Sequence, residues 1–408
     1  MQCRFCGTPL SHVFIDLFNS PPSNAFLTEE QLNEPELFFP LKVYTCDACF
    51  LVQIDEYQKS DAIFDNKYVY FSSFSSSWLE HARKYTIDMR ERFGLNEHSQ
   101  VIEIASNDGY LLQYFVQAGI PVLGVEPTAN TAEAARKKGI PSITEFFGTA
   151  LARRMLQQGT KADLLLGNNV LAHVPDIVDF VRGMKLVLKE NGVITMEFPH
   201  LMQLMENNQF DTIYHEHFSY LSFTTVSAIF KAQGLVMFDV EELPTHGGSL
   251  RIYARHAEDA TKPIGARVGA LLDKEASKGM NEPQWYDGLQ QQAFKIKLDL
   301  LDFLRTSVLD GKRISAYGAA AKGNTLLNYC GIRSDLLDFV VDANPDKQNK
   351  YLPASHIPVV NEDVLRQSRP DYVMILPWNL REEITRQLSY IRQWNGKFIV
   401  AIPALEVW

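Results

Sequence analysis

The segment 212–220 holds the densest group of side chains that could perform acid–base chemistry. It reads T-I-Y-H-E-H-F-S-Y and carries Tyr214, His215, Glu216 and His217 at consecutive positions. Histidine titrates near neutral pH, and a neighbouring carboxylate can fix its tautomer. A metal site would need a third ligand at a matching spacing, and none lies nearby in the sequence. We therefore favour acid–base chemistry; a polar rim that only holds a loop is the other interpretation.

Four of the five cysteines form two pairs, each with two residues between its members. This spacing lets a turn direct both thiolates at one tetrahedral zinc ion, and short strands broken by a Pro-Pro loop between the pairs are typical of a zinc ribbon. A disulfide pair and four unrelated buried thiols are the alternatives; a reducing compartment disfavours the first, and the regular spacing disfavours the second. Four thiolates leave no position for substrate, so the metal is expected to be structural. The predicted zinc ligands are Cys3, Cys6, Cys46 and Cys49, and Cys330 is expected in the core.

A polar loop, Ser106-Asn107-Asp108-Gly109, follows the apolar strand V-I-E-I-A, and Glu126 ends the next strand about twenty residues later. An acid at this distance suits hydrogen bonding to ribose hydroxyls. The loop carries one glycine, whereas a dinucleotide loop has three to make room for a pyrophosphate. The pattern therefore favours a cofactor with a ribose and a charged amino-acid tail but no pyrophosphate.

A third strand ends at Gly167-Asn168-Asn169, where the methyl-donor end of such a cofactor is expected. His173 follows it in V-L-A-H-V-P-D; packing or cofactor shaping is favoured over chemistry for this histidine. The predicted cofactor-binding residues are Glu103, Ser106, Asn107, Asp108, Gly109, Glu126, Pro127, Asn168, Asn169 and His173.

Alternating strands and helices from about residue 77 must position these loops, and this alternation predicts a parallel α/β sheet. The 408 residues predict two or three domains. A net charge of −10 disfavours a nucleic-acid partner. No apolar run reaches the roughly 20 residues of a membrane span, and the N-terminus lacks the features of a signal peptide. We therefore expect a cytoplasmic chain without a membrane partner; its oligomeric state is left open.

Other polar segments could complete a site. Tyr68 and Tyr70 share a strand face by spacing, and could cover the site or pack at a domain junction. The segment 245–251 reads T-H-G-G-S-L-R, which suits close approach to an anionic or sugar ligand, with a plain hairpin turn as the alternative. The run 318–323, G-A-A-A-K-G, is a weak indication of a phosphate loop.

The cysteine pairs, the S-N-D-G loop, Y-H-E-H-F-S-Y and H-G-G-S-L-R, in this order, resemble the sugar C-methyltransferases of deoxysugar biosynthesis. The resemblance covers nearly the whole chain. It implies an S-adenosylmethionine-dependent enzyme that methylates carbon 3 of a nucleotide-linked 4-keto-6-deoxysugar through a base-generated enolate. It also implies a zinc-binding domain at 1–70, a class I methyltransferase core with a Rossmann-like fold at 71–255, and a second Rossmann-like domain at 256–408.

The resemblance also implies roles for single residues. His217 becomes the base, with His215 as the alternative, and Glu216 and Tyr214 orient the base or stabilise the enolate. Tyr68 or Tyr70 completes the pocket. The residues implied in substrate binding are His246, Gly247, Gly248, Ser249, Arg251, Lys322, Asn324, Lys350 and Tyr351.

Three other functions compete with this interpretation. One is an N- or O-methyltransferase that acts on a sugar nucleotide or another small molecule, and one is a non-catalytic protein that binds S-adenosylmethionine and zinc. The third, a nucleic-acid methyltransferase with a zinc ribbon, is disfavoured by the acidic charge. The sequence does not predict which sugar, nucleotide or pathway is involved.

Overall fold

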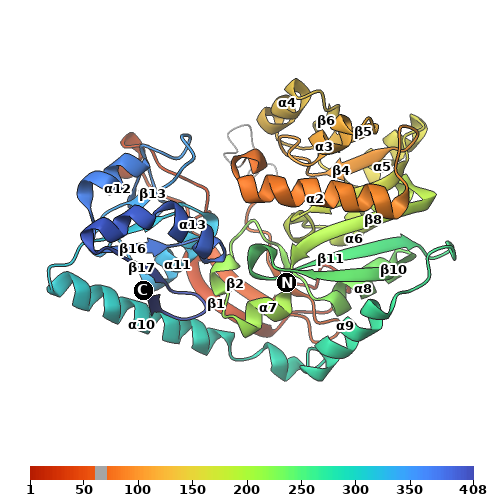
Figure 1. The fold of residues 1–408 in the computed structure, drawn as a ribbon. Helices are drawn as coiled ribbons and strands as arrows, with labels where there is room; N and C mark the ends of the chain where they lie inside the picture. The colour runs from red at the N-terminus through yellow and green to blue at the C-terminus, as the bar shows by residue number, and fades with distance from the viewer. Residues whose placement is uncertain (60–70) are drawn as a thin grey trace. The chain divides into compact units, whose positions relative to one another are not determined.

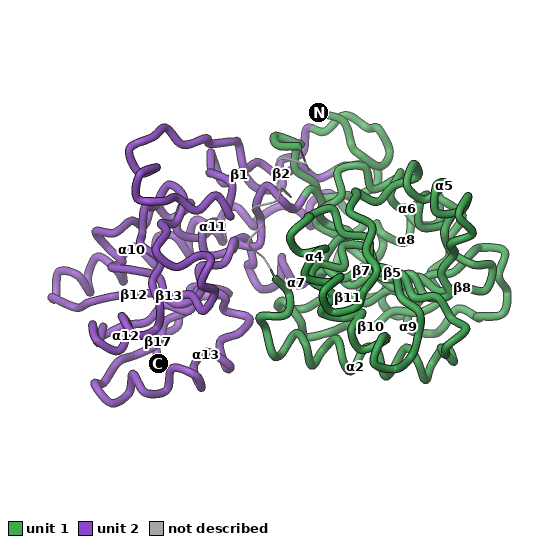
Figure 2. The backbone as a smooth tube through the Cα atoms, turned by 90° about the horizontal axis from the view of Figure 1, so that it is seen from above, with its two compact units in different colours: residues 1–10, 46–201, 218–282 green, residues 11–45, 202–217, 283–408 purple. Residues whose placement is uncertain are grey.

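The computed structural model describes residues 1–59 and 71–408 (Figure 1). The described chain forms two compact units, each assembled from separate stretches of sequence (Figure 2). Unit 1 comprises residues 1–10, 46–201 and 218–282, and unit 2 comprises residues 11–45, 202–217 and 283–408. The expected domain boundaries at residues 70 and 255 stay a prediction. Unit 2 contains residues from both sides of each boundary.

Unit 1 is built on a seven-stranded sheet of order β10-β11-β8-β7-β4-β5-β6. Its strands are β4 (Val101–Ile104), β5 (Val122–Val125), β6 (Ser142–Ile143), β7 (Ala162–Asn168), β8 (Leu188–Pro199), β10 (Leu235–Leu243) and β11 (Ser249–His256). The pairs from β6 to β8 are parallel, and β11 runs antiparallel to both of its neighbours. The loops after β4, β5 and β7 therefore meet at one edge of the sheet.

Helices cover both faces of this sheet. They are α2 (Ser76–Phe93), α3 (Leu112–Gln117), α4 (Ala129–Lys137), α5 (Thr149–Gln157), α6 (Ile177–Val187), α8 (Phe223–Ala232) and α9 (Ala266–Ser277). Helix α2 begins where the Ser75 side chain accepts a hydrogen bond from the Trp78 N–H, and it ends at Gly94, whose positive φ of 62° ends many helices.

Alternation along the strands divides the core of unit 1 into two layers. In β7, Leu164 and Leu166 pack in one cluster with Tyr85 of α2, whereas Leu165 packs in the other with Val181 of α6. Successive side chains of a strand point to opposite faces, so a continuous apolar run fills both layers of a covered sheet. The buried Cys3 and Cys46 belong to the second layer.

Unit 2 has its own seven-stranded sheet, of order β14-β15-β13-β12-β16-β17-β18. The strands are β12 (Ile314–Tyr317), β13 (Val340–Val341), β14 (Lys350–Tyr351), β15 (Pro358–Val360), β16 (Tyr372–Ile375), β17 (Lys397–Val400) and β18 (Glu406–Val407). The five inner strands are parallel and the two outer strands antiparallel to them. The helices of this unit are α10 (Leu289–Leu309), α11 (Ala321–Cys330), α12 (Glu362–Ser368) and α13 (Arg381–Gln387). The prediction of a second Rossmann-like fold is confirmed.

The N-terminal region contributes to both units. The antiparallel pair β1 (His12–Ser20) and β2 (Phe39–Thr45) belongs to unit 2, whereas β3 (Val52–Ile54) pairs with β9 (Ser219–Tyr220) in unit 1. A helix α7 (Leu201–Glu206) follows β8. Among the described helices, none combines the length and apolar character that a membrane crossing requires.

Candidate active site

The four paired cysteines meet in unit 1. Their sulfur atoms all lie within 4.8 Å of one another, and none is in a disulfide. The Sγ atoms of Cys3 and Cys49, and those of Cys6 and Cys46, are each 3.5 Å apart. Four sulfurs bound to one zinc ion at about 2.3 Å would be roughly 3.8 Å apart. The donor set therefore fits a closed, structural zinc site, and no other such cluster occurs among residues 1–59 and 71–408.

Both cysteine pairs sit on matching turns. Gly7 donates its N–H to the carbonyl of Cys3, and Phe50 does so to Cys46, each with a positive φ. These bonds close the turns that aim both thiols of a pair inward. The Gln53 amide donates to the Cys3 sulfur at 3.2 Å and stabilises the thiolate that a metal requires.

Arg4, inside the first turn, ties the zinc site to the segment that carries His173. Its guanidinium donates to the carbonyl of Pro175 at 2.6 Å and to that of Ile54. The backbone N–H of Arg4 donates to the Gln53 side chain at 2.9 Å. The zinc site thus supports a loop next to the predicted cofactor site.

The polar loop after β4 has left-handed backbone at two positions. Asn107 and Gly109 both have positive φ, and a Cβ on Gly109 would lie 2.2 Å from the side chain of Ile140. Only glycine avoids this overlap at the start of the following helix. Glu126, directly after β5, accepts the N–H of Asn107 and the N–H of Thr128, both at 2.9 Å. The predicted loop and acid therefore lie side by side.

Three carboxyl groups surround this loop. Burial raises the pKa of Glu103 well above its usual value, the Tyr110 hydroxyl lowers it, and the charges of Glu126 and Asp108 raise it further. Burial also raises the pKa of Glu126. A cation placed here would favour the charged forms of Glu103 and Glu126, which suits a cofactor that carries an ammonium and a sulfonium group.

Several polar atoms at this edge are buried and have no hydrogen-bond partner among the described residues. They are Ser106 Oγ, Asp108 Oδ1, Asn168 Nδ2 and Asn169 Oδ1. Buried polar groups are seldom left unpaired in native proteins, so a ligand is expected to complete them. This set and the surrounding carboxyl groups fit S-adenosylmethionine. His173 is half-buried in a short 3-10 turn after β7, and Pro127 follows Glu126.

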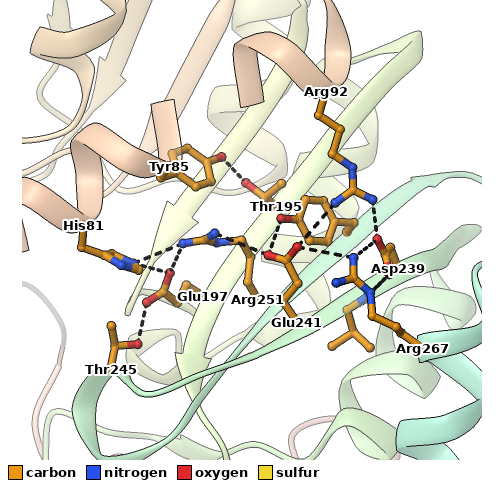
Figure 3. A network of polar contacts seen from close by, with 12 residues as sticks. His81, Tyr85, Arg92, Thr195, Glu197, Asp239, Glu241, Thr245, Arg251 and Arg267 are labelled. Atoms are coloured by element: carbon orange, nitrogen blue, oxygen red, sulfur yellow. Dashed lines mark hydrogen bonds and ion pairs between the residues drawn. The ribbon is translucent and has the colours of Figure 1, made fainter. Parts of the chain in front are cut away.

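A buried carboxylate, Glu197 near the end of β8, connects three elements of unit 1 (Figure 3). It accepts hydrogen bonds from Arg251 of β11 at 2.9 Å, from His81 of α2 at 2.8 Å and from the Thr245 hydroxyl at 2.9 Å. Burial opposes its charge, but these donors outweigh it and lower the pKa of Glu197 to about 2. The guanidinium of Arg251 also packs over the Tyr85 ring at 4.7 Å.

This network positions the turn between β10 and β11. Thr245 begins the turn and His246 follows with a φ of 55°. The ring of His246 lies edge-on to Trp78, with centroids 5.0 Å apart, and its Nε2 is 3.4 Å from the Asn169 amide. The segment is thus a hairpin turn that faces the cofactor edge. Gly247 and Gly248 complete the turn, and the buried Ser249 donates back to the carbonyl of Thr245.

The segment 212–217 forms a turn in unit 2 that brings Tyr214 into contact with His217. The Tyr214 hydroxyl and His217 Nε2 are 2.9 Å apart, and His217 Nδ1 lies 3.0 Å from the carbonyl of Thr212. A carbonyl only accepts, so Nδ1 carries a proton, and in the neutral form of the ring Nε2 accepts from the Tyr214 hydroxyl. This tautomer presents Nε2 as the basic nitrogen.

Glu216 and His215 lie in different surroundings from His217. Glu216 accepts a hydrogen bond from the Asn24 amide at 2.6 Å, and burial raises its pKa to about 7 against the effects of Asn24 and Lys347. His215 lies 3.3 Å from the carbonyl of Pro40, and burial lowers its pKa. In the described structure the Tyr214 hydroxyl contacts the His217 ring, whereas the Glu216 carboxylate contacts Asn24.

The remaining predicted residues belong to unit 2, apart from two tyrosines. Lys322 donates to the Asn379 side chain at 2.7 Å, and Asn324 donates to the carbonyl of Ser23 at 2.5 Å. Lys350 and Tyr351 form the outer strand β14. Tyr68 and Tyr70 lie outside the described residues. All assignments of catalytic, cofactor-binding and substrate-binding residues stay predictions.

Sequence reasoning missed Glu197, His81 and Trp78. A charged residue within the apolar strand I-T-M-E-F was a usable signal for Glu197, because a lone buried carboxylate needs a partner. His81 and Trp78 sit on an ordinary amphipathic helix and gave no comparable signal.

An open cavity of about 670 Å³ lies at the opposite edge of the unit 1 sheet. Its lining includes Ser99, before β4, and Asp163, at the start of β7. Ligands of open α/β sheets bind outside the carboxyl ends of the strands, so we place the site at the loops and not in this cavity.

Three family models match the chain. A zinc binding domain matches residues 3–64, a methyltransferase domain residues 78–240, and a C-methyltransferase C-terminal domain residues 244–403. The methyltransferase model agrees with the sheet and loops of unit 1, and the zinc model spans the four cysteines.

The C-methyltransferase NovU of Streptomyces niveus is 33% identical over 406 residues, which cover 100% of this chain and 96% of the relative. A ubiquinone biosynthesis O-methyltransferase of Bartonella quintana is 26% identical over 99 residues, 24% of this chain and 40% of the relative. Among solved structures, an S-adenosylmethionine-dependent methyltransferase from Clostridium acetobutylicum covers 44% of this chain and 92% of its own, at 12% identity and a TM-score of 0.36.

The magnesium protoporphyrin IX methyltransferase of Synechocystis, solved with bound S-adenosylmethionine, covers 43% of this chain and 78% of its own, at 15% identity and a TM-score of 0.33. The full-length likeness to NovU decides the family, and the predicted cofactor and structural zinc agree with the matching models. The chain belongs to the C-methyltransferase family and is an S-adenosylmethionine-dependent methyltransferase.

Proposed function

We propose that this enzyme transfers a methyl group to carbon 3 of a nucleotide-linked 4-keto-6-deoxysugar. The observation that carries the proposal is the geometry of His217. Its Nδ1 donates to a main-chain carbonyl and its Nε2 is oriented by the Tyr214 hydroxyl, so the ring is prepared to take a proton. Methylation of the saturated carbon beside a keto group needs such a base, because that carbon must lose its proton before it can attack a methyl group.

The keto group at carbon 4 acidifies the proton on carbon 3. In the proposed reaction His217 Nε2 removes this proton, and the electron pair of the broken C–H bond moves into an enolate. The Tyr214 hydroxyl, displaced from Nε2 by the substrate, is then available as a donor to the enolate oxygen. When bound, S-adenosylmethionine supplies an electrophilic methyl group.

Glu216 has a supporting role in this proposal. Its carboxyl group is buried and its pKa is raised to about 7, so it is partly protonated near neutral pH. The hydrogen bond from Asn24 holds it in place. When it is protonated, this carboxyl group adds no second negative charge to a site in which the enolate develops.

The second Rossmann-like sheet supports the proposed nucleotide-linked substrate. Its loop after β12 leads through Gly318, with a φ of 90°, into α11, and Lys322 lies in the first turn of that helix. Backbone N–H groups and a cation at a helix start suit a diphosphate. The sugar itself is proposed from the order of the sequence motifs.

The test uses a panel of 4-keto-6-deoxysugar nucleotides deuterated at carbon 3, incubated with the enzyme and S-adenosylmethionine. We expect a product heavier by one methyl group that has lost the carbon 3 label, as measured by mass spectrometry. A methylated product that keeps the label would instead support N- or O-methylation. The absence of product from every keto sugar would overturn the substrate class.

A further inference from the structure

The segment that carries His217 is fastened to the second sheet by a buried carboxylate. Asp211 lies in the 3-10 turn η4 (Phe210–Thr212), and its side chain is wholly buried. Its carboxylate accepts the indole N–H of Trp378 at 2.8 Å. Trp378 begins the turn η7 (Trp378–Leu380), which follows the carboxyl end of β16.

A second bond fastens the same segment two residues later. The hydroxyl of Thr325, a buried residue of α11, donates to the carbonyl of Ile213 at 2.8 Å. Helix α11 follows β12, the strand that neighbours β16. Both fastening groups therefore come from elements that follow adjacent strands of one sheet.

The two bonds flank the carbonyl that orients the histidine. Thr212 stands between Asp211 and Ile213, and its carbonyl oxygen accepts from His217 Nδ1 at 3.0 Å. The Thr212 carbonyl shares a planar peptide unit with the Ile213 N–H, which donates to the carbonyl of Phe210 at 3.1 Å. The bonds of Asp211 and Ile213 hold the residues on either side. The direction of this carbonyl selects which nitrogen of His217 carries the proton.

The charge on Asp211 is supported from the same sheet. Lys322 lies over the Trp378 ring at 4.6 Å, and its charge lowers the pKa of Asp211, as does the hydrogen bond from Trp378. Burial has the larger effect and raises that pKa to about 6. A buried carboxylate with these partners is costly to maintain unless its position matters.

We propose that Asp211, Trp378 and Thr325 are positioning residues for His217: they hold the Thr212 carbonyl so that Nδ1 is protonated and Nε2 is the basic nitrogen. The inference rests on the proposed function only where it names His217 as the base. Residues that follow strands of the second sheet then affect catalysis by holding the segment that carries His217, in addition to any part they have in substrate binding.

The test compares Thr325→Val and Trp378→Phe with Trp394→Phe. Thr325→Val removes one hydroxyl and nearly preserves volume. Trp378→Phe removes the side-chain donor of a buried carboxylate, so Thr325→Val is the safer variant for folding. Trp394 is a matched control: its indole N–H donates to the carbonyl of Pro370 at 2.9 Å in the same unit, away from this segment.

The first measurement is the ¹⁵N spectrum of the histidine rings, assigned with His217→Gln. We expect one tautomer, protonated at Nδ1, for His217 in the wild type and in Trp394→Phe, and a mixture in the other two variants. This readout needs neither substrate nor turnover. A single unchanged tautomer in both Thr325→Val and Trp378→Phe would overturn the proposal.

The second measurement is steady-state kinetics. Misplacing a reacting group by about 1 Å costs up to roughly a hundredfold in rate, so kcat should fall about tenfold to a hundredfold in Thr325→Val and Trp378→Phe. The KM for S-adenosylmethionine should stay the same, since its site is in unit 1. An equal loss in Trp394→Phe would point to general destabilisation and overturn the proposal. Mixed tautomers with an unchanged kcat would leave the positioning intact and contradict His217 as the base.

Discussion

Both Rossmann-like sheets have an acidic residue after one strand that accepts an N–H from the loop after the neighbouring strand, but the two arrangements serve different roles. In unit 1, Glu126 follows β5 and accepts the N–H of Asn107 from the loop after β4 at 2.9 Å. In unit 2, Asp342 follows β13 and accepts the N–H of Ala319 from the loop after β12 at 2.8 Å. In each case an acid from one strand braces the loop of its neighbour.

The two loops differ in the polar groups that surround the bracing acid. Around Glu126 several buried polar atoms have no partner in the described structure, and burial raises its pKa. Asp342 is half-buried and has a cation close by, since Lys347 lies 3.7 Å from it and also donates to the carbonyl of Ala319 at 2.9 Å. The edge of unit 1 thus keeps polar capacity for a cofactor, whereas elements of unit 2 hold the chain's own segment 211–217.

Removing zinc should have the largest effect and should act on unit 1. Zinc binding contributes on the order of 10 kcal/mol in small zinc domains, and here the ligands sit next to Arg4, which holds the carbonyl of Pro175. We expect chelation to lower the melting temperature and to weaken S-adenosylmethionine binding, as measured by calorimetry before and after zinc is restored. Unchanged cofactor affinity in the chelated protein would break the link between the zinc site and the cofactor edge.

Replacing the proposed base in unit 2 should reduce methyl transfer without changing cofactor binding in unit 1. His217→Ala is expected to reduce methyl transfer by roughly a thousandfold, within the range for loss of a general base, because Nε2 can no longer accept the proton. Its affinity for S-adenosylmethionine, measured by calorimetry, should equal that of the wild type. Turnover close to the wild-type rate would rule out His217 and return His215 to consideration.

The buried ion pair of unit 1 should matter more for stability than an exposed pair of unit 2. Arg251→Met leaves Glu197 buried without its main charge partner and should lower the free energy of unfolding by about 3–5 kcal/mol. Arg381→Met, whose partner Glu406 lies 2.7 Å away at the surface, should cost about 0–1 kcal/mol. Urea unfolding measures both variants, and equal losses would contradict the comparison.

The same carboxylate predicts a pH window. The folded-state pKa of Glu197 is about 2, below the unfolded value of about 4.3, so its contribution to stability is complete above the unfolded pKa. That contribution should disappear as the pH falls from about 4 toward 2. In Arg251→Met the free energy of unfolding should fall less steeply across this window, because the Glu197 carboxyl has lost a charge partner that lowers its pKa.

The smallest expected effect compares the two bracing acids directly. Glu126→Gln should weaken S-adenosylmethionine binding by roughly tenfold to a hundredfold, the cost of losing a charged acceptor, whereas Asp342→Asn should leave it unchanged. Because burial raises the pKa of Glu126, wild-type affinity should decline with falling pH before an ordinary glutamate titrates. Titration calorimetry across pH checks both points. A matching loss in Asp342→Asn would show that the two braces are not functionally distinct.

Much of the site could be read from short stretches of sequence. The cysteine spacing, the S-N-D-G loop and Glu126 at the end of the next strand are local patterns, because a turn or a strand end fixes which neighbours meet. The same holds for Tyr214 and His217, which lie three positions apart and share one turn. These features follow from chain geometry over a few residues.

Only the tertiary structure decided the long-range partners. Asn24 meets Glu216 across 192 positions, and Trp378 meets Asp211 across 167, although neither pair has a motif that would connect them. The N-terminal region also divides, with its cysteines in unit 1 and its β1–β2 pair in unit 2. The resemblance implied that Glu216 orients the base or stabilises the enolate, which stays a prediction; only the structure shows that the Asn24 amide donates to its carboxylate. The sequence determined which groups could do the chemistry; packing decided which of them touch, because a buried charge takes whichever donor the fold brings within reach.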